Sequence, residues 1–565
     1  MNKLIAIAVL VVTRAAAVDS APGDSAFDAL VDEYYSGYPA AHPTAATELG
    51  LHQQDSALED YSSSGITKEL ERLKSWQGRL GKVDEKTLSP ARRRDLRLAK
   101  QGTLSQLTEL EEVKSYRRLP DFYSGLASRT IYDLIKRDFA APQVRIESVI
   151  ARQEKIPTLL AAGKKNLGRV STIAVGVALE EIPSIIDFFE KDVPLAFASV
   201  PDASRQARLG ASTRKAVAAL KDYQQFIKDK LQPHADGPIA IGEAIFRKKL
   251  LADEMIDIPT EELLKRGEAE LARLQKQFVE TAARIDPNRS FREVQVEMTR
   301  DHGTPDRVIA DIQGRLGALR QFLVDHQIVS LPQDTVPTVQ ETPPFMRAMT
   351  MASMETPGPF ETRAVEAFYN VTLPEKSWKK DQIEDYMRGA FNRPLLDVVS
   401  IHEAFPGHYV QFIWLPHVQS KVRKFEGANS NAEGWAHYTE QMLLDEGFGN
   451  GDAKLRLGQL QDALLRAARY VVAIRMHTRN MGFDEAKRFF HDQGYQSEKV
   501  AEMESKRATE DPTFLYYTWG KLEVLRLRED YKKKLGKDYS LKKFHDAFLL
   551  EGAMHLPLVR EALLQ

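Results

Sequence analysis

The chain has 565 residues, of which 43% are hydrophobic and 28% are charged, and it contains no cysteine. The apolar fraction is large enough for an extensive core and excludes wholesale disorder. The formal net charge of −2 does not provide the excess of positive charge that favours binding to duplex nucleic acid or to an anionic membrane surface. Without cysteine there are no disulfides, no thiol catalysis, no iron–sulfur clusters and no cysteine-ligated zinc.

Residues 1–17 have the pattern of a secretory signal peptide. Lys3 precedes an unbroken apolar run over residues 4–12, and three alanines at residues 15–17 suit cleavage. Nine apolar residues are too few to span a bilayer as a helix. Since there is no cysteine for lipid attachment, we expect a periplasmic or secreted protein that is free of the membrane once the signal is removed. The alternative is a short N-terminal segment that anchors the chain to the membrane.

Most of the remaining chain has helical periodicity, with apolar residues three or four positions apart. This predicts a mostly α-helical fold with a small β element. The best strand candidate is residues 365–371, and a weaker one is residues 171–177. The clearest helical segments are residues 67–80, 90–113, 148–160, 212–231, 260–285 and 305–323.

One shift in composition falls between residues 331 and 360, where there are six prolines. Proline excludes regular helix and favours extended chain. The segment is either a linker between two domains or ordered chain that lines a cleft, and we favour the cleft because linkers are usually more polar. We therefore expect an N-terminal helical region, residues 18–340, and a catalytic region, residues 341–565, to form one continuous body.

Histidine is concentrated in one part of the chain, where residues 402, 408, 417, 437 and 477 account for five of the 13. Two histidines four residues apart on a helix, with a glutamate between them, can bind zinc. His402 and His408 are six apart, which on a straight helix places them about 240° apart around the axis. Pro406 and Gly407 can break or bend the helix and bring His408 back beside His402. The alternative is two unrelated histidines at a helix end.

A second predicted helix begins near residue 429. It carries Glu433, His437 and Glu440 on one face, at positions i, i+4 and i+7. A carboxylate 25 residues after His408 completes the His/His/Glu set of a zinc site and leaves an open position for water. The alternative is a solvated polar face, although Gly434 beside a tryptophan indicates a closely packed, buried helix.

Two motifs resemble those of a bacterial family known as domain of unknown function 885. They are residues 402–408, His-Glu-Ala-Phe-Pro-Gly-His, and residues 433–436, Glu-Gly-Trp-Ala. The resemblance covers residues 340–565 and includes residues 466–469 and 517–522. The family is similar to helical zinc carboxypeptidases, so the resemblance implies a large helical metallopeptidase-like fold with a deep cleft.

The resemblance also assigns roles. His402, His408 and Glu433 become the ligands of one zinc ion, and Glu403 becomes the general base. His437 stands where the family usually has an aliphatic residue, and the sequence leaves open whether it joins the metal shell.

Three more residues of the predicted helix at 455–477 form a basic stripe: Arg466, Arg469 and His477. In one interpretation an arginine binds a substrate carboxylate and His477 stabilises the oxyanion. In the other, the arginines neutralise buried carboxylates such as Glu440.

Two aromatic segments complete the candidate site. Tyr517 is a candidate oxyanion donor, with an ordinary core aromatic as the alternative. Residues 368–370 resemble the family's strand before the metal helix, whose edge we expect to bind an extended substrate.

The sequence as a whole predicts an exported zinc metallopeptidase that hydrolyses short peptides, carboxypeptidase- or dipeptidase-like, by a zinc-activated water. The alternatives are a zinc hydrolase of a non-peptide amide or ester, and an inactive peptide-binding protein. The expected partner is a peptide or small amide, with no nucleic acid. The sequence leaves the oligomeric state and the substrate side chains open.

Overall fold

Helices make up most of the protein, which was analysed as a computed structural model that describes residues 21–347 and 350–565. The predicted signal peptide lies outside the described residues. The first helices are α1 (Asp24–Ala41), α2 (Pro43–Glu48), α3 (Ser63–Gly81) and α4 (Pro90–Thr108). They are followed by α5 (Ser115–Arg118), α6 (Asp121–Ile135), α7 (Pro142–Asn166), α8 (Thr172–Asp187), α9 (Val193–Ala196) and α10 (Ala203–Phe226).

The remaining helices come before and after a small sheet in the sequence. Before it come α11 (Glu243–Glu254), α12 (Thr260–Ile285), α13 (Phe291–Thr299) and α14 (Val308–Asp325). After it come α15 (Lys380–Phe391), α16 (Arg393–Glu403), α17 (His408–Trp414), α18 (Lys421–Phe425), α19 (Asn429–Asp445), α20 (Ala453–Arg479), α21 (Phe483–Asp492), α22 (Glu498–Glu510), α23 (Tyr516–Leu535), α24 (Leu541–Leu550) and α25 (Leu556–Leu564).

The mostly α-helical prediction is confirmed, and each of the six clearest predicted segments falls on a helix: α3, α4, α7, α10, α12 and α14. The weaker strand candidate, residues 171–177, is wrong. Its first residue is the N-cap of α8, where Ser171 Oγ accepts a hydrogen bond from the Ala174 N–H at 3.1 Å. Val175, Ala178 and Ile182 then follow one another on the buried face at helical spacing.

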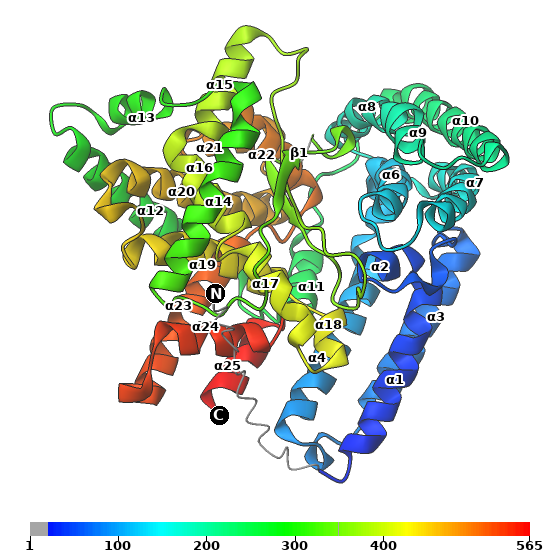
Figure 1. Cartoon of the computed structure of the whole chain (residues 1–565), viewed down its shortest axis with the longest axis horizontal. Coiled ribbons are helices and arrows are strands. Elements are labelled where there is room, and N and C mark those ends of the chain that lie inside the picture. Colours follow the sequence, from blue (N-terminus) through cyan, green and yellow to red (C-terminus); the bar gives the residue numbers. More distant parts are fainter. Residues whose placement is uncertain (1–20, 348–349) are drawn as a thin grey trace, which may run out of the picture.

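The sheet has three strands, β1 (Thr338–Glu341), β2 (Ala352–Glu355) and β3 (Phe368–Val371), in the order β1-β3-β2. The central strand β3 is parallel to β1 and antiparallel to β2. The predicted strand at 365–371 is therefore confirmed from Phe368 onward, whereas Val365 is 73% exposed and lies outside it. In Figure 1 the sheet lies between helices α6–α10 on the right and α12–α16 on the left.

Helices before and after residue 340 share one apolar core. It includes Phe27 and Leu98 from the first helices, Leu319 from α14, and Trp435 and Phe548 from the C-terminal helices. A second core lies among α6–α10, and a third joins α11–α13 to α20. The site described below lies beside the first core.

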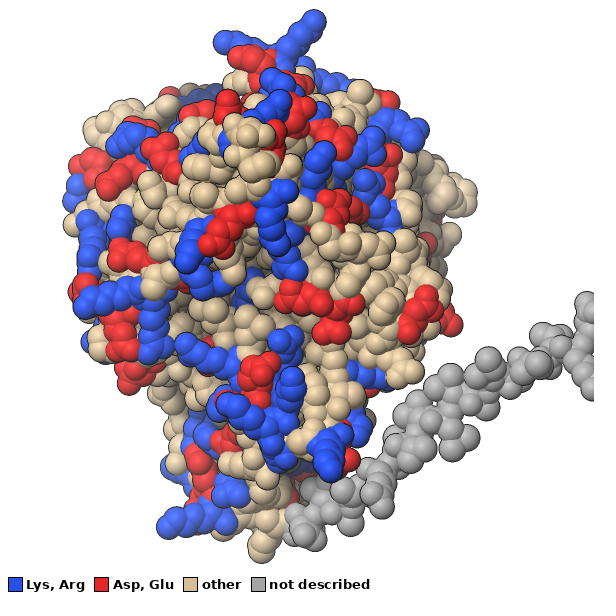
Figure 2. All heavy atoms as spheres, turned by 90° about the vertical axis from the view of Figure 1, so that its left-hand side faces the viewer, with Lys and Arg blue, Asp and Glu red and all other residues tan. Residues whose placement is uncertain are grey.

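Figure 2 shows acidic and basic side chains interspersed over the face it presents, with neither sign dominating it. Within the described residues, no helix combines the length and the apolar character needed to cross a membrane.

Candidate metal centre

A sharp break between α16 and α17 brings the two histidines of the first motif together. Helix α16 ends at Glu403 and α17 begins at His408. The turn between them requires glycine, because a Cβ on Gly407 would lie 1.7 Å from the His402 carbonyl oxygen. The imidazole rings of His402 and His408 lie edge to face, with centroids 4.8 Å apart. The predicted return of His408 to the side of His402 is therefore confirmed.

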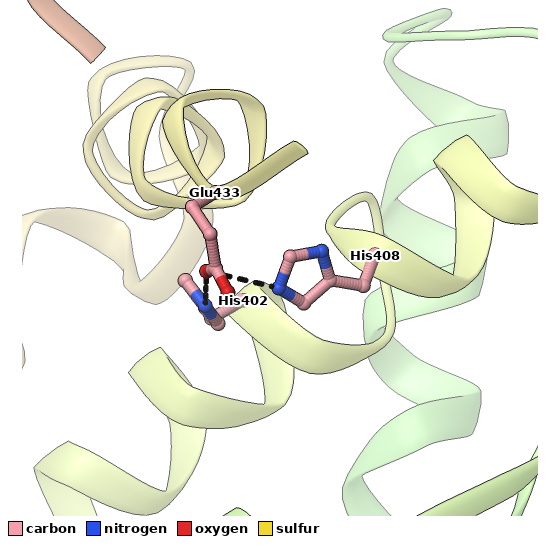
Figure 3. A group of neighbouring side chains, drawn as sticks. All are labelled: His402, His408 and Glu433. Carbon is pink, nitrogen blue, oxygen red and sulfur yellow. Dashed lines mark ion pairs between the residues drawn. The ribbon is translucent and has the colours of Figure 1, made fainter. Parts of the chain in front are cut away.

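Glu433 on α19 completes the group (Figure 3). Its Oε2 lies 3.4 Å from His402 Nε2 and 3.3 Å from His408 Nε2. In a tetrahedral zinc shell with ligand bonds of about 2.0–2.1 Å, neighbouring ligand atoms are about 3.4 Å apart. The ligand atoms of these three residues all lie within 4.8 Å of one another, so the group could hold a metal ion.

Close helix packing fixes Glu433 in place. A Cβ on Gly434 would lie 2.5 Å from the backbone of Gly520, so α19 and α23 approach each other at a glycine contact. The buried Trp435 donates its Nε1–H to the Pro406 carbonyl at 3.0 Å. Helix α19 is thereby bound to the same turn that positions His408, as expected for the closely packed helix that the sequence indicated.

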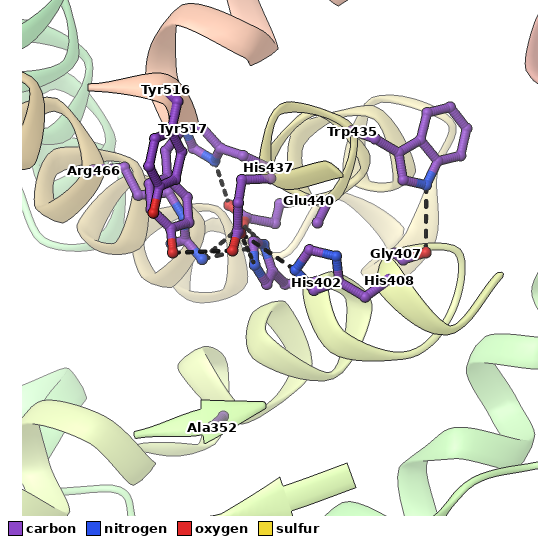
Figure 4. Close-up of polar contacts among 12 residues, drawn as sticks. Ala352, His402, Gly407, His408, Trp435, His437, Glu440, Arg466, Tyr516 and Tyr517 are labelled. Atoms are coloured by element: carbon purple, nitrogen blue, oxygen red, sulfur yellow. Dashed lines mark hydrogen bonds and ion pairs between the residues drawn. The ribbon is translucent and has the colours of Figure 1, made fainter. Parts of the chain in front are cut away.

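Glu440 supports the group from behind (Figure 4). One carboxylate oxygen lies 2.7 Å from His402 Nδ1, and the other lies 2.9 Å from His437 Nδ1. A carboxylate on one ring nitrogen fixes the tautomer that leaves the other nitrogen free for a metal. His437 contacts Glu440 through its Nδ1, and the metal-binding group within the described residues consists of His402, His408 and Glu433.

The charges of the group perturb its pKa values. Burial raises the pKa of Glu433, but the neighbouring His408 and His402 outweigh burial and hold this pKa well below its ordinary value. Burial and the Arg466 charge lower the pKa of His402, while hydrogen bonds to Glu433 and Glu440 raise it to about 9. Both shifts reflect close contact between imidazole and carboxylate.

Glu403 directly follows the first histidine. It is only 6% exposed, and burial raises its pKa against the opposing charges of His408 and His402. Its Oε2 is buried with no hydrogen-bond partner among the residues that the structure describes. A buried carboxylate with an unpartnered oxygen and a raised pKa suits a proton acceptor.

The group opens into a cavity of about 340 Å³. His402, Glu403, His408 and Glu433 line one part of its wall, and residues 350–354 line another. These five residues belong to the proline-rich segment, which therefore lines a cavity.

The two predicted substrate-binding arginines line this cavity but have internal partners. Arg466 pairs with Asp462 and lies 3.3 Å from Glu440. Arg469 makes two hydrogen bonds of 2.6 Å to Glu504. The alternative interpretation, in which the arginines neutralise buried carboxylates such as Glu440, describes both contacts.

His477 lies away from the cavity. Its Nε2–H donates to the Ala508 carbonyl at 2.8 Å, and burial lowers its pKa to about 4. It is on the same face of α20 as Arg466, but eleven residues of helix separate them by about 16 Å along the axis. The predicted oxyanion role does not fit this position.

Tyr517 does reach the centre. Its hydroxyl donates to Glu433 Oε1 at 3.1 Å and accepts a hydrogen bond of 2.6 Å from Arg507 Nη2. Sequence reasoning missed Arg507, whose place on α22 follows no motif. The only local signal was its position ten residues before Tyr517.

The predicted substrate-binding edge of residues 368–370 is wrong. These residues belong to β3, whose two edges are already paired with β1 and β2. The strand that lines the cavity from an outer position of the sheet is β2.

Fold and site together define a mostly helical protein with a buried His/His/Glu group beside a cavity. The chain belongs to the family described as "Bacterial protein of unknown function (DUF885)", whose model matches residues 43–563. The comparison with curated proteins gave no match.

Two solved structures share the fold. A candidate lipoprotein of unknown function from Shewanella oneidensis is 25% identical, with a TM-score of 0.77 over 95% of this chain and 100% of its own. A candidate lipoprotein from Colwellia psychrerythraea is 18% identical, with a TM-score of 0.78 over 96% of this chain and 98% of its own.

Proposed function

We propose that this protein is a zinc-dependent peptidase that hydrolyses short peptides. The observation that carries the proposal is the His402–His408–Glu433 group with Glu403 beside it at the cavity wall. Zinc held by these residues would supply a Lewis acid that lowers the pKa of a water molecule and polarises a carbonyl oxygen. We place this activity in the periplasm or outside the cell, in line with the solved relatives described as candidate lipoproteins.

Glu403 is the general base in this proposal. Its carboxylate adjoins a metal-ligand position, and its unpartnered Oε2 is free, among the described residues, to accept a proton. Glu403 takes a proton from the attacking water and delivers it to the leaving amine, a role that its raised pKa favours.

Tyr517 is the oxyanion donor. Its hydroxyl already lies 3.1 Å from Glu433, within one hydrogen bond of a metal ligand. The phenol has a single O–H, which in this role leaves Glu433 and donates instead to the charge that develops on the substrate carbonyl oxygen.

The outer strand β2 supports a peptide as the substrate. The Thr372 N–H donates to the Met351 carbonyl at 2.9 Å, which makes residues 351 and 353 members of hydrogen-bonded pairs with β3. Ala352 and Met354 alternate with them, so their backbone N–H and C=O groups point to the opposite edge, where the Ala352 carbonyl accepts a hydrogen bond of 2.7 Å from Thr350 Oγ1. An extended peptide can pair with such an edge beside the metal group, whereas a small metabolite has no backbone to use it.

Metal analysis and peptide digestion together test the proposal. Wild type, Glu403→Gln and the exposed control Glu485→Gln are loaded with zinc, desalted, analysed by mass spectrometry and incubated with a mixed-sequence peptide library. We expect one zinc in all three proteins and hydrolysis by wild type and Glu485→Gln only. Wild type without zinc, or an active Glu403→Gln, would refute it.

The same assay separates the alternatives. Turnover of acylated amino acids or esters without peptide hydrolysis would favour a non-peptide hydrolase. Zinc-loaded wild type that binds peptides without cleaving any substrate would favour a binding protein.

A further inference from the structure

Three arginines line the cavity: Arg466, Arg469 and Arg507. The first two are bound to buried carboxylates, as described above. Arg507 has no carboxylate within ion-pair distance among residues 21–347 and 350–565. The one hydrogen bond of its guanidinium within that part of the chain goes to the Tyr517 hydroxyl.

The guanidinium of Arg507 is held in position by aromatic rings. Its central carbon lies 4.9 Å from the centre of the Phe514 ring and 5.6 Å from that of Tyr517. Contacts of this kind fix a guanidinium without satisfying its N–H groups. The side chain is partly exposed at the cavity wall, so N–H groups remain for a ligand.

We propose that Arg507 binds the C-terminal carboxylate of the peptide substrate, an inference that rests on the proposed peptidase function. A guanidinium recognises a carboxylate with two parallel hydrogen bonds. It repels the ammonium group of a peptide N-terminus. The C-terminal end of the substrate therefore lies on the Arg507 side of the metal group.

The distance from Arg507 to the metal group selects how many residues are released. Hydrogen bonds of 2.6 and 3.1 Å link Arg507 Nη2 through the Tyr517 hydroxyl to Glu433 Oε1. One residue of extended chain spans about 3.3–3.6 Å, and its carboxylate adds a hydrogen bond of about 2.8 Å. These two bonds bound the separation of Arg507 Nη2 and Glu433 Oε1 at about 5.7 Å, close to the roughly 6.1–6.4 Å that one residue and its hydrogen bond span. Two residues span about 9.4–10.0 Å, so one residue between the scissile bond and the carboxylate is the closer match. The substrate is a peptide that loses a single C-terminal residue.

The test compares free acids with amides. Acetylated mixed-sequence pentapeptides are prepared with a free C-terminal carboxylate or as matched C-terminal amides. They are incubated with zinc-loaded wild type, Arg507→Gln, Arg507→Lys and Arg488→Gln, an exposed control on α21. Products are identified by mass spectrometry.

We expect wild type and Arg488→Gln to release single amino acids from the free acids with a kcat/KM about 100-fold above that for the amides. Arg507→Gln abolishes this preference because it slows the cleavage of the free acids only. Arg507→Lys restores part of the preference. Equal cleavage of acids and amides by wild type would overturn the proposal. So would release of dipeptides, or an equal loss on both substrates in Arg507→Gln, which would indicate that Arg507 only positions Tyr517.

A binding measurement separates this inference from the proposed function. Calorimetric titration of Glu403→Gln, with and without Arg507→Gln, uses the same two peptide sets. Arg507 is expected to favour the acids about 100-fold in Kd, and equal Kd values would overturn its role. If no peptide is cleaved by wild type, the proposed function fails, while the titration alone still decides the role of Arg507.

Discussion

Replacement of Glu440 by glutamine tests whether the residues behind the metal group tune it. The Glu440 carboxylate is fully buried and lies 2.7 Å from His402 Nδ1, a distance typical of a charge-assisted hydrogen bond. Glutamine keeps the shape but removes the charge that holds His402 and faces Arg466. Loss of such an outer contact typically weakens metal affinity 10- to 100-fold, or about 1.4–2.7 kcal/mol.

The assay is competition for zinc with a chromophoric chelator at fixed pH, together with thermal unfolding with and without zinc. Glu446→Gln, at the exposed C-cap of α19, is the matched control and is expected to behave as wild type. A second effect is expected on folding, because Asp462 remains as the carboxylate partner of the buried Arg466 after the ion pair with Glu440 is lost. A broken buried ion pair costs about 3–5 kcal/mol. If Glu440→Gln lowers the melting temperature but changes the zinc Kd less than twofold, the reasoning about His402 is refuted.

Two further substitutions probe the turn and the helix that carry the ligands. Gly407→Ala forces a Cβ against the His402 carbonyl, so it is expected to destabilise the fold by about 3 kcal/mol or more and to abolish zinc binding. The control Gly482→Ala places its Cβ where no atom lies within 4 Å and is expected to change neither property. Equal melting curves and zinc contents for the two variants would contradict this. Burial raises the pKa of Glu254 from 4.5 to about 8, although the Ser430 N–H at the start of α19 opposes the shift. The pKa of Glu254 is higher in the folded than in the unfolded state, so the protonated carboxyl contributes to folding stability. This stability is fully present below about pH 4.5 and is lost as the pH rises through 8, by up to about 5 kcal/mol. Denaturant unfolding from pH 5 to 9 is expected to show this loss in wild type but not in Glu254→Gln, and parallel pH profiles would exclude it.

The grouping of His402, His408 and Glu433 could be predicted because its information is local. The spacing of His402 and His408, the proline and glycine between them, and the helical periodicity around Glu433 are all written in short stretches of sequence. Each stretch forms one element, and the glycine contact between α19 and α23 then leaves little freedom in how those elements meet. The same periodicity places Glu440 on the face of Glu433 and His437, and only the fold shows that Glu440 contacts His402 on another helix.

The strand that lines the cavity could not be predicted in this way. Residues 365–371 alternate in polarity and read as a strand, and β3 does form there. The order β1-β3-β2 is set by pairing between segments far apart in the chain. It places β3 in the centre and β2 at an outer position, while residues of both strands line the cavity. A four-residue strand among prolines carries too short a pattern to be recognised.

The arginines show most clearly where sequence reasoning ends. A helical projection gives the angle of a side chain around its axis, so it correctly groups Arg466 with His477, but their separation along the axis excludes His477 from the cavity. It also cannot show which charges are already neutralised. Arg469 is bound by Glu504, and Glu504 lies on the same helix as Arg507, one turn before it. The carboxylate of α22 thus pairs with the arginine of another helix and leaves the arginine of its own helix to face the cavity. Only the packing of α20 against α22 decides which of these guanidinium groups can meet a substrate.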